Sequence, residues 1–326
     1  AGQDEEGISV LRSRQQGIAL ITILMLVALA TIIAATIAKR QSYTNDSTAY
    51  MMRQSQSLYY AKSAEAFFSE LLVQDAESDS KADYLHETWA KPMPAFPIDG
   101  GYVSGQLIDE SGKFNLNALL KDDGTPNEES RQFFEGLLKR VGLPAEVSQA
   151  VIDWQDSDDL TIGAMGAESN YYSGLSNGYL VANTPFQSAE ELKQVRGVEG
   201  QNFDLIAPYV TAAPNNLSKI NINTASALLL ASLDEKLDIN TIDQVLKQKS
   251  ANMEYFSNVD ELWQLEPFTQ VDPQKRPIAI QVFDVNSNFF KAQIEVVLSE
   301  RKRQFSSYLW RKDQHVSIFS RSLAPF

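Results

Sequence analysis

The feature that most constrains this chain is an uninterrupted apolar segment near its amino terminus. Ile18 to Ala38 reads IALITILMLVALATIIAATIA, 21 residues without a charge, and Lys39 and Arg40 end it. A helix needs about 20 apolar residues to cross the hydrocarbon core of a bilayer. A cleaved secretory signal peptide would have a shorter apolar region, about 7–15 residues, followed by a small-residue cleavage site. The segment therefore predicts a membrane-spanning helix.

The helix is expected to continue well beyond the apolar segment. Residues 41–74 contain no glycine or proline, and apolar residues recur there at spacings of three and four, as on one buried face of a helix. These residues are Leu58, Ala61, Ala64, Phe68 and Leu71. A helix from Ile18 to about Gln74 would be about 85 Å long at 1.5 Å per residue. Its first half would lie in lipid, and its second half would pack on a soluble domain.

Composition excludes several classes of function. The chain has 326 residues, enough for two or three domains, with a net charge of −14 and a pI near 4.7. Phosphate binding needs clustered Lys and Arg, so nucleic acid is not expected as a partner. There is no cysteine, and His86 and His315 are far apart in sequence, which argues against disulfides, a histidine-based metal site and a catalytic triad. We expect no catalytic residues and no enzymatic activity.

Alternating residues predict strands at both ends of a long helical region. Residues 75–100 are rich in Asp, Ser and Pro and are expected to form a loop, whereas Gly101–Asp109 alternates like a strand. The region from 114 to 276 has helical character. Three further strands of an antiparallel meander are expected after it. They are Phe289–Leu298, Arg303–Trp310 and His315–Phe319, separated by polar residues 299–302 and 311–314.

Two blocks inside the helical region resemble each other. Phe114-Asn-Leu-Asn-Ala118 is similar to Ile220-Asn-Ile-Asn-Thr-Ala225, and residues 186–195 are similar to residues 256–265. Ser188 followed by Glu191 predicts a capped helix start, because the two side chains can satisfy each other's backbone N–H groups. We interpret the blocks as a diverged duplication of small helical units.

Four aspartates lie within seven residues, and they are the densest chemical signal in the chain. Asp153, Asp156, Asp158 and Asp159 precede two glycines, Gly163 and Gly166, and then Glu168. Such crowding without a base favours a bound cation, and calcium takes 6–8 oxygen ligands from carboxylates and carbonyls. The spacing is not that of an EF-hand. Two alternatives stay open: a solvated acidic loop whose side chains cap helices, and a catalytic carboxylate pair, for which nothing supplies a reaction partner.

A second motif resembles a DNA-binding motif, but the surrounding residues carry the wrong charge for DNA. The Asn-Thr-Ala motif and Val195-Arg-Gly-Val198 resemble helix-hairpin-helix modules, in which a glycine-centred hairpin offers backbone N–H groups to a DNA phosphate. Residues 141–192, however, contain eight acidic residues and no Lys or Arg. DNA binding is therefore disfavoured.

The residues before the apolar segment resemble the leader of type IV prepilins. Arg14-Gln-Gln-Gly17 stands directly before Ile18. In that family a membrane peptidase cuts after the glycine and the new amino terminus is methylated, so the resemblance implies processing between Gly17 and Ile18. Most pilin-like proteins carry Glu at the fifth mature residue, where this chain has Thr22. The resemblance implies that a subunit without this glutamate docks poorly beneath another one and suits the filament tip; alternatively, Thr22 carries no positional meaning.

The order of elements resembles the K-type minor pseudopilins of the bacterial type II secretion system. The resemblance implies an α+β fold, with a pilin-like long amino-terminal helix packed on an antiparallel sheet and a large helical (SAM-like) domain inserted between strands. The implied segments are a cleaved leader (1–17), the transmembrane half of the helix (18–38), the rest of the helix and the first strand region (39–113), the inserted domain with two SAM-like units (114–276) and the carboxy-terminal strands (277–326).

The same family shares an Asp-Trp-x-Asp-x-Asp…Gly-Ala-Glu stretch and holds calcium in its helical domain. The resemblance implies that Asp156, Asp158, Asp159 and Glu168 are calcium ligands. Asp153 would be a ligand or a helix-end group, and Asn183 would supply a further oxygen.

The resemblance also implies a role in assembly and a location. The chain would be a single-pass inner-membrane protein with its bulk in the periplasm, where it caps or initiates the pseudopilus tip for export of folded proteins. Its partners would be the I-type and J-type minor pseudopilins through the amino-terminal helices, the prepilin peptidase, the inner-membrane assembly platform, and either secreted cargo or the outer-membrane pore. The alternative is a membrane-tethered DNA-uptake or periplasmic protein.

Overall fold

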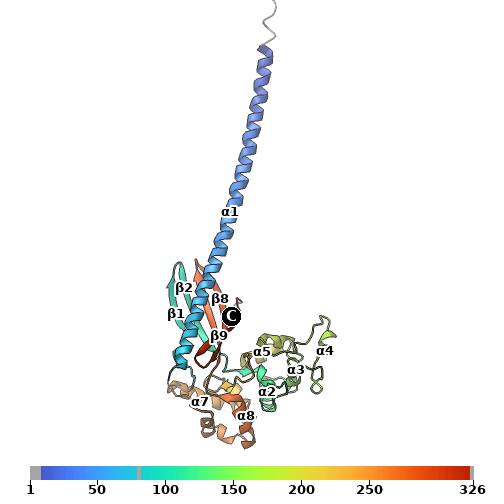
Figure 1. Ribbon diagram of the computed structural model, residues 1–326, viewed down its shortest axis with the longest axis vertical. Helices are drawn as coiled ribbons and strands as arrows, with labels where there is room; N and C mark the ends of the chain where they lie inside the picture. The colour runs from blue at the N-terminus through green and yellow to red at the C-terminus, as the bar shows by residue number, and fades with distance from the viewer. Residues whose placement is uncertain (1–8, 79–81, 324–326) are drawn as a thin grey trace, which may run out of the picture. The chain divides into compact units, whose positions relative to one another are not determined.

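The computed structural model describes residues 9–78 and 82–323, with side chains from residue 19 onward. It divides into two units, one up to Tyr59 and one from Tyr60 onward. Helix α1 (Ser9–Ala76) contributes to both units (Figure 1). The long helix expected from Ile18 to about Gln74 is therefore confirmed, and it begins at an earlier residue than predicted.

The first unit is the amino-terminal part of α1. An 18-residue window within it has a mean hydropathy of 2.7, and none of that window is buried, so this helix is long and apolar enough to cross a membrane. Its threonines satisfy their hydroxyl groups within the helix. Thr31 and Thr36 each donate to the carbonyl oxygen four residues earlier at 2.8 Å. Polar groups bonded in this way are compatible with a lipid environment.

The second unit contains a five-stranded antiparallel sheet in the order β1-β2-β7-β8-β9. Its strands are β1 (Met93–Ile98), β2 (Gly101–Asp109), β7 (Phe289–Leu298), β8 (Arg301–Lys312) and β9 (His315–Ser322). Strand β2 pairs with β7 along its whole length, from Gly101 opposite Leu298 to Asp109 opposite Phe290. This register joins two segments that are separated by the entire helical region, so the α+β fold with an insertion between strands is confirmed.

The carboxy-terminal part of α1 packs on this sheet (Figure 1). Ala61, Ala64 and Phe68 are buried as predicted, but Leu58 is exposed and Leu71 is only half-buried. Leu72 completes the buried face instead, because it lies four residues after Phe68 and therefore on the same side of the helix. The sheet contributes the other half of this core, including Val103, Leu107, Phe290, Ala292, Ile294, Val296 and Leu309.

Three strand predictions need correction. Strand β1 lies within residues 75–100, which were expected to form a loop. Pro94 and Pro97 hid it, but an edge strand tolerates proline because one row of its N–H groups has no ladder partner. Strand β8 extends at both ends into the residues expected to flank it, and β9 begins at His315 as predicted but continues beyond Phe319 to Ser322. The turns are shorter than predicted because Ser299, Glu300 and Asp313 adopt positive φ angles.

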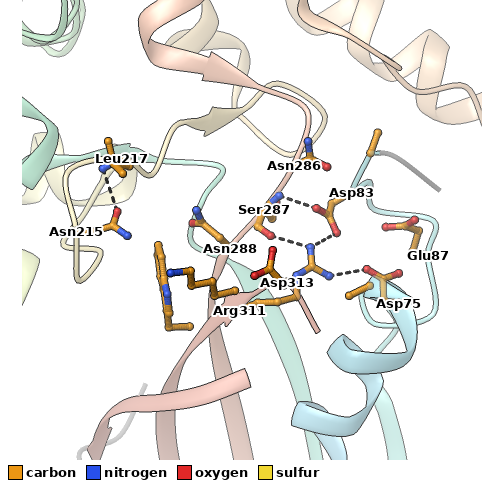
Figure 2. A pocket seen from close by; sticks show the side chains of 14 residues that line it. Asp75, Asp83, Glu87, Asn215, Leu217, Asn286, Ser287, Asn288, Arg311 and Asp313 are labelled. Atoms are coloured by element: carbon orange, nitrogen blue, oxygen red, sulfur yellow. Dashed lines mark hydrogen bonds and ion pairs between the residues drawn. The ribbon is translucent and has the colours of Figure 1, made fainter. Parts of the chain in front are cut away.

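A buried cluster of ions ties the end of α1 to the sheet. Arg311 of β8 donates to Asp75 at 2.7 Å and to Asp83 at 2.5 Å, and it also donates to the backbone carbonyl oxygen of Ser287 (Figure 2). These residues line a cleft of about 610 Å³. Because a buried guanidinium needs partners for its charge and its donors, this cluster selects one arrangement of three segments.

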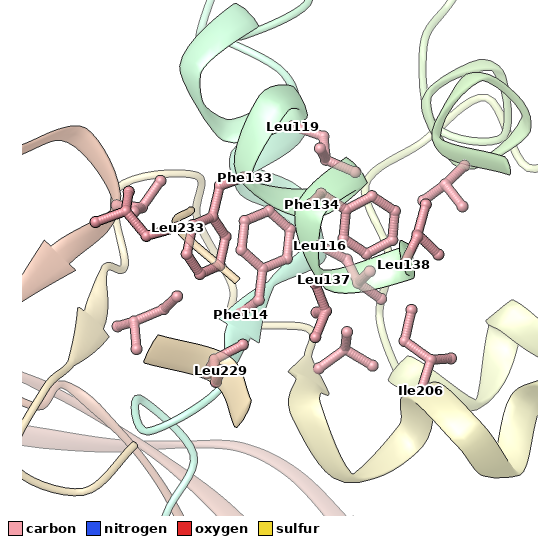
Figure 3. Close-up of a cluster of buried hydrophobic side chains, with 14 of the residues drawn as sticks. Phe114, Leu116, Leu119, Phe133, Phe134, Leu137, Leu138, Ile206, Leu229 and Leu233 are labelled. Atoms are coloured by element: carbon pink, nitrogen blue, oxygen red, sulfur yellow. The ribbon is translucent and has the colours of Figure 1, made fainter. Parts of the chain in front are cut away.

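The inserted region is mostly helical and has its own hydrophobic core. Phe114 stacks between Phe133 and Phe134, with ring centroids 5.7 and 5.2 Å away (Figure 3). Its helices are η1 (Leu116–Leu119), α2 (Glu128–Val141), α3 (Val147–Asp153), α4 (Ser169–Ser173), η2 (Ala189–Gln194), α5 (Gln201–Ile206), η3 (Ala207–Tyr209), α6 (Ala227–Ala231), α7 (Ile239–Ala251), η4 (Val259–Gln264), η5 (Phe268–Gln270), η6 (Pro273–Lys275) and α8 (Arg276–Val282).

Two short parallel strand pairs, which were not predicted, occur in this region. Strand β3 (Phe114–Asn115) pairs with β4 (Val210–Thr211), and β5 (Ile220–Asn221) pairs with β6 (Phe283–Asp284). Each pair is only two residues long, which leaves no alternating pattern to detect. Each one joins the beginning of a helical unit to its end.

The two similar blocks make equivalent hydrogen bonds. Asn117 exchanges two bonds with the backbone of Phe186, accepting at 2.8 Å and donating at 3.0 Å. Asn223 exchanges the same two bonds with Phe256, at 2.7 and 3.0 Å. The predicted capping box of Ser188 and Glu191 is present, although the helix that it starts is a 3-10 helix. Equivalent contacts at equivalent places support the interpretation of two related units, which stays a prediction.

Candidate metal centre

The acidic loop between α3 and α4 is closed by the aspartate at the end of α3. Asp153 is fully buried, and its carboxylate accepts hydrogen bonds from the backbone N–H groups of Ile162, at 3.1 Å, and Ala167, at 2.8 Å. A Cβ at Gly166 would lie 2.4 Å from the Asp153 carboxylate, so only glycine fits there. Gly163 has a φ of +68°, which also favours glycine. The two glycines therefore allow the loop to fold back onto Asp153.

Three buried carboxylates meet inside this loop. Asp153, Asp156 and Glu168 each offer an oxygen, and these oxygens all lie within 4.8 Å of one another. Within residues 9–78 and 82–323, Asp156 Oδ1 and both carboxylate oxygens of Glu168 are buried without a hydrogen-bond partner. An unpaired buried polar group costs about 1–3 kcal/mol, and more when it is charged. Buried, unpaired and convergent oxygens fit a divalent cation.

The electrostatics of the protein alone disfavour this arrangement. Burial, reinforced by the charges of Asp153 and Asp158, raises the pKa of Asp156 from 3.8 to about 7. Burial, reinforced by the surrounding aspartates, raises the pKa of Glu168 from 4.5 to about 7. Burial also raises the pKa of Asp153, although its two backbone hydrogen bonds oppose the effect. A bound cation would reverse these shifts, because it favours the charged forms.

Asn183 adds a neutral oxygen beside the carboxylates. Its backbone N–H donates to the carbonyl oxygen of Trp154 at 3.1 Å, which places it next to the carboxyl end of α3. Its φ is +48°, and its side-chain Oδ1 is buried without a partner among the described residues. Carbonyl oxygens of this kind are common calcium ligands.

Asp158 and Asp159 occupy the exposed rim of the loop. Asp158 accepts a hydrogen bond from the backbone N–H of Leu160 at 2.7 Å. Both charges help to raise the pKa of Glu168. Of the six predicted ligands, the structure thus brings Asp153, Asp156 and Glu168 together, sets Asn183 beside them and leaves two aspartates at the rim. Whether these residues are ligands stays a prediction.

The prediction from sequence missed residues that hold the loop in place. Gln149 accepts a hydrogen bond from the backbone N–H of Met165 at 2.9 Å. It stands four residues before Asp153 on one face of α3, a spacing that offers a detectable signal. Arg196 donates to the carbonyl oxygens of Ala164 and Gly166 from a segment about 30 residues away, for which the local pattern has no signal.

Aromatic side chains cover the inner side of this site. Trp154 lies edge-on to Tyr172, with ring centroids 5.2 Å apart, and Tyr172 stacks on Tyr179 at 5.3 Å. Trp154 and Tyr172 are buried. This wall excludes water from one side and so strengthens electrostatic interactions within the loop.

A second acidic group has a structural explanation. Asp75, Asp83 and Glu87 also place oxygens within 4.8 Å of one another. Arg311 pairs with both aspartates (Figure 2). Glu87 accepts bonds from the Tyr84 N–H and the Trp89 indole. These carboxylates already have donors, in contrast to Glu168 and to Oδ1 of Asp156 in the loop.

Other sequence motifs have local explanations. Gly174-Leu-Ser-Asn-Gly178 matches the Gly-x-Ser-x-Gly pattern of hydrolases, but it forms an exposed turn after the five-residue α4 and does not join a strand to a helix. The hairpin glycine Gly197 donates its N–H to Glu199 at 2.7 Å. That carboxylate occupies the position where a DNA phosphate would bind, and it would repel one.

The processing residues lie in α1. Gly17 and Ile18 are helical in backbone, and their side chains fall outside the described residues. Thr22 donates its hydroxyl to the carbonyl oxygen of Ala19 at 3.3 Å. Neither the cleavage position nor the meaning of Thr22 is tested by this geometry, and both stay predictions.

Comparison with known proteins gives consistent matches. Two profiles of the family described as "Type II secretion system (T2SS), protein K" match residues 112–215 and 220–282. Type II secretion system protein K of Aeromonas hydrophila is 30% identical, covering 95% of this chain and 97% of the relative. The protein of the same name from Pectobacterium carotovorum subsp. carotovorum is 31% identical, covering 97% and 98%.

A solved structure shares the fold. It is titled the crystal structure of the GspK-GspI-GspJ complex from the enterotoxigenic Escherichia coli type 2 secretion system. The matching chain has a TM-score of 0.76 and 24% identity, and the match covers 86% of this chain and 99% of that one.

Proposed function

This chain belongs to the type II secretion system protein K family of minor pseudopilins, and from this premise we propose that it caps or initiates the tip of the pseudopilus. The observation that carries the proposal is the combination of an apolar helix with a bulky helical domain inserted into a pilin-like sheet. The helix can pack against similar helices of other subunits, whereas the inserted domain is too wide to repeat along a uniform filament. The role is structural and needs no catalytic group.

The proposed location follows from α1. The apolar part of the helix anchors the chain in the inner membrane, with the second unit in the periplasm. The prepilin peptidase cleaves between Gly17 and Ile18, and the helix is then extracted into the filament by the inner-membrane assembly platform. Mass spectrometry of the membrane-extracted chain tests this step. A mature chain beginning at methylated Ile18 is expected, and an intact leader in an assembled complex would contradict it.

The proposed partners are other minor pseudopilins of the I and J types. The chain of similar fold comes from a crystal structure titled as a GspK-GspI-GspJ complex, and the exposed apolar residues of this α1 offer a surface for packing against the helices of such partners. Thr22 lacks the carboxylate that would pair with the amino terminus of a neighbouring subunit, which supports a position at the top. The tip then contacts either secreted cargo or the outer-membrane pore.

The proposed cofactor is calcium, held by Asp156, Glu168 and Asn183 inside the loop and by Asp158 or Asp159 at the rim, with Asp153 as ligand or as the helix-end group that closes the loop. Calcium would supply positive charge to oxygens that have no other partner. The ion would connect the end of α3, the start of α4 and the segment around Asn183. Its effect is to stabilise the inserted domain.

Calcium titration of the full chain in detergent tests the site. Saturating calcium is expected to raise the thermal midpoint, because a ligand at 100 times its Kd stabilises the folded state by about 2.7 kcal/mol. The double variant Asp156→Asn/Glu168→Gln should lose this increase. Asp123→Asn, at an exposed aspartate of the same domain, should keep it. An unchanged midpoint in the parent chain would remove calcium from the proposal and leave the assembly role intact.

A further inference from the structure

Arg196 contacts the acidic loop on both sides of Glu168. Its guanidinium Nη1 donates to the carbonyl oxygen of Gly166 at 3.0 Å and to that of Ala164 at 3.4 Å, both before Glu168 in the chain. The guanidinium also lies over the ring of Tyr171, 4.7 Å from its centroid, after Glu168. The backbone N–H of Arg196 donates to the Tyr172 hydroxyl at 3.3 Å. The residues on either side of Glu168 are thus held by one side chain.

The backbone of the acidic loop is held on one side by hydrogen-bond acceptors and on the other by a hydrogen-bond donor. Its N–H groups point to acceptors on α3, because Ile162 and Ala167 donate to Asp153 and Met165 donates to Gln149. Its carbonyl groups point to the donor Arg196. A loop held only from α3 would be free to rotate its carbonyls and to turn Glu168 away from Asp156. Arg196 therefore helps to fix the backbone that carries Glu168.

Arg196 does this without neutralising the site. Its hydrogen bonds go to backbone carbonyls and the side chain stacks on a tyrosine, while both Glu168 oxygens lack a partner among the described residues. A planar guanidinium can bridge two carbonyls and lie flat on a ring at the same time, which an ammonium group cannot do. The carboxylate is left available for a cation.

We propose that Arg196 is the positioning residue of the metal site, and that it couples calcium binding to the segment Val195–Val198 and helix α5 that follows it. This inference rests on the proposed calcium site. Residues that orient metal ligands from outside typically change metal affinity by about 10–100-fold when they are removed. Calcium should in turn rigidify the segment that carries Arg196, because coupling between two sites is reciprocal.

A matched control exists in α2, at an arginine that contacts a loop of the second helical unit. Arg140 is also half-buried, and its guanidinium also donates to backbone carbonyls, those of Asp234, Glu235 and Leu237, at 2.9, 3.2 and 2.8 Å. The loop that it holds contributes to neither of the two carboxylate groups found among the described residues. Replacing Arg140 therefore removes the same kind of contact and leaves the acidic loop intact.

The test measures metal affinity in the full chain, purified in detergent and stripped of metal. Terbium luminescence sensitised by nearby aromatic residues, and displacement of terbium by calcium, give the apparent Kd. Arg196→Ala should weaken calcium binding by about 10–100-fold. Arg196→Lys should recover part of the loss, since its ammonium group can still donate to a carbonyl but cannot lie flat on the ring of Tyr171. Arg140→Ala should bind like the parent chain.

Hydrogen exchange supplies the second measurement. Calcium should slow exchange in residues 195–206 of the parent chain and of Arg140→Ala, and this slowing should disappear in Arg196→Ala. If Arg196→Ala fails to fold, Arg196→Lys must still bind more weakly than the parent chain. Equal affinity of the parent chain and both Arg196 variants would overturn the inference alone. A parent chain that binds no calcium or terbium would overturn the calcium site and the inference together.

Discussion

Two kinds of buried carboxylate among the described residues differ in what faces them. Asp75 and Asp83 both accept hydrogen bonds from Arg311, which supplies donors and one positive charge within the protein. Asp156 and Glu168 face each other and Asp153, with buried oxygens that lack donors within the described part of the chain. The first kind stabilises a fold by itself, whereas the second kind stabilises it only when a cation is bound. This difference separates a structural cluster from a candidate site, although both are acidic and partly buried.

The second kind predicts an unusual dependence of stability on pH. Without calcium, the pKa values of Asp156 and Glu168 are about 7 in the folded chain and near 4 when it is unfolded. The folded state then holds more protons, so its free energy of unfolding should fall as pH rises from about 4.5 to 7. Thermal melts in chelator should show this fall. Asp75 and Asp109, whose pKa values are also raised, contribute a part that calcium does not alter.

Calcium should displace the protons from Asp156 and Glu168, and it should therefore remove their contribution to the fall in the free energy of unfolding with pH. Calorimetry in buffers of different ionisation enthalpy should detect release of about two protons on binding at pH 6 and almost none at pH 8.5. The Asp156→Asn/Glu168→Gln chain should release none at either pH. Proton release that is the same at both pH values would contradict the assigned shifts.

At the scale of elements, the long helix, the sheet and the segment after α1 depend on a few cross-links. The apolar contact of Phe68 and Leu72 with the sheet holds α1 in place, and Glu65 accepts two bonds from Arg321 of the edge strand at 2.8 Å. Arg311 adds the link to Asp83. The two ionic contacts join residues more than 200 positions apart, so they define how the two ends of the sheet domain meet.

Replacing Arg311 tests the strength of this link. Arg311→Met keeps an unbranched apolar side chain but removes the guanidinium, which lies over the ring of Phe290, and leaves Asp75 and Asp83 without their cation. Loss of one partner from a buried ion pair costs about 3–5 kcal/mol. The free energy of unfolding, measured by urea unfolding of the detergent-solubilised chain, should fall by that amount. Arg131→Met, which breaks partly exposed pairs within α2, should cost no more than about 1 kcal/mol. If both variants lose the same free energy of unfolding, the Arg311 cluster contributes no more to stability than the exposed ion pairs of α2.

At the scale of the whole molecule, one chain combines an apolar anchor with a large acidic domain. The first unit can satisfy its backbone and threonine hydroxyls without water, as a bilayer requires. The second unit has two separate hydrophobic cores, one between α1 and the sheet and one within the helical insertion. This division suits a subunit that is held by its helix and recognised by its folded domain.

The proposed tip position can be tested at Thr22. Thr22→Glu would supply a carboxylate for the amino terminus of a neighbouring subunit, so the variant should dock beneath other subunits and appear in more copies per pseudopilus. Thr22→Gln has a similar size without the charge and should behave like the parent chain. Because the natural chain has no cysteine, one introduced cysteine gives a unique cross-linking position for counting neighbours. Copy numbers that do not differ between the two variants would contradict the role of Thr22.

Features that depend only on residues close together in the sequence could be predicted from the sequence. The length of the apolar run predicts the helix, and alternation predicts Gly101–Asp109 and the three final strands, because side-chain periodicity is local. The density of acidic residues marks the loop of the candidate site for the same reason. Strand β1 escaped prediction because its prolines oppose strand propensity unless the strand is known to lie at an edge.

The tertiary structure alone decided which distant residues meet. It pairs β2 with β7 across the insertion, selects Leu72 over Leu71 for the buried face, and brings Asp156 and Glu168 together while Asp158 and Asp159 stay at the rim. It also sets Arg196 on the loop and Arg311 between two aspartates. These choices depend on packing and on electrostatic interactions between segments far apart in the chain, and no pattern within a short window of sequence encodes them.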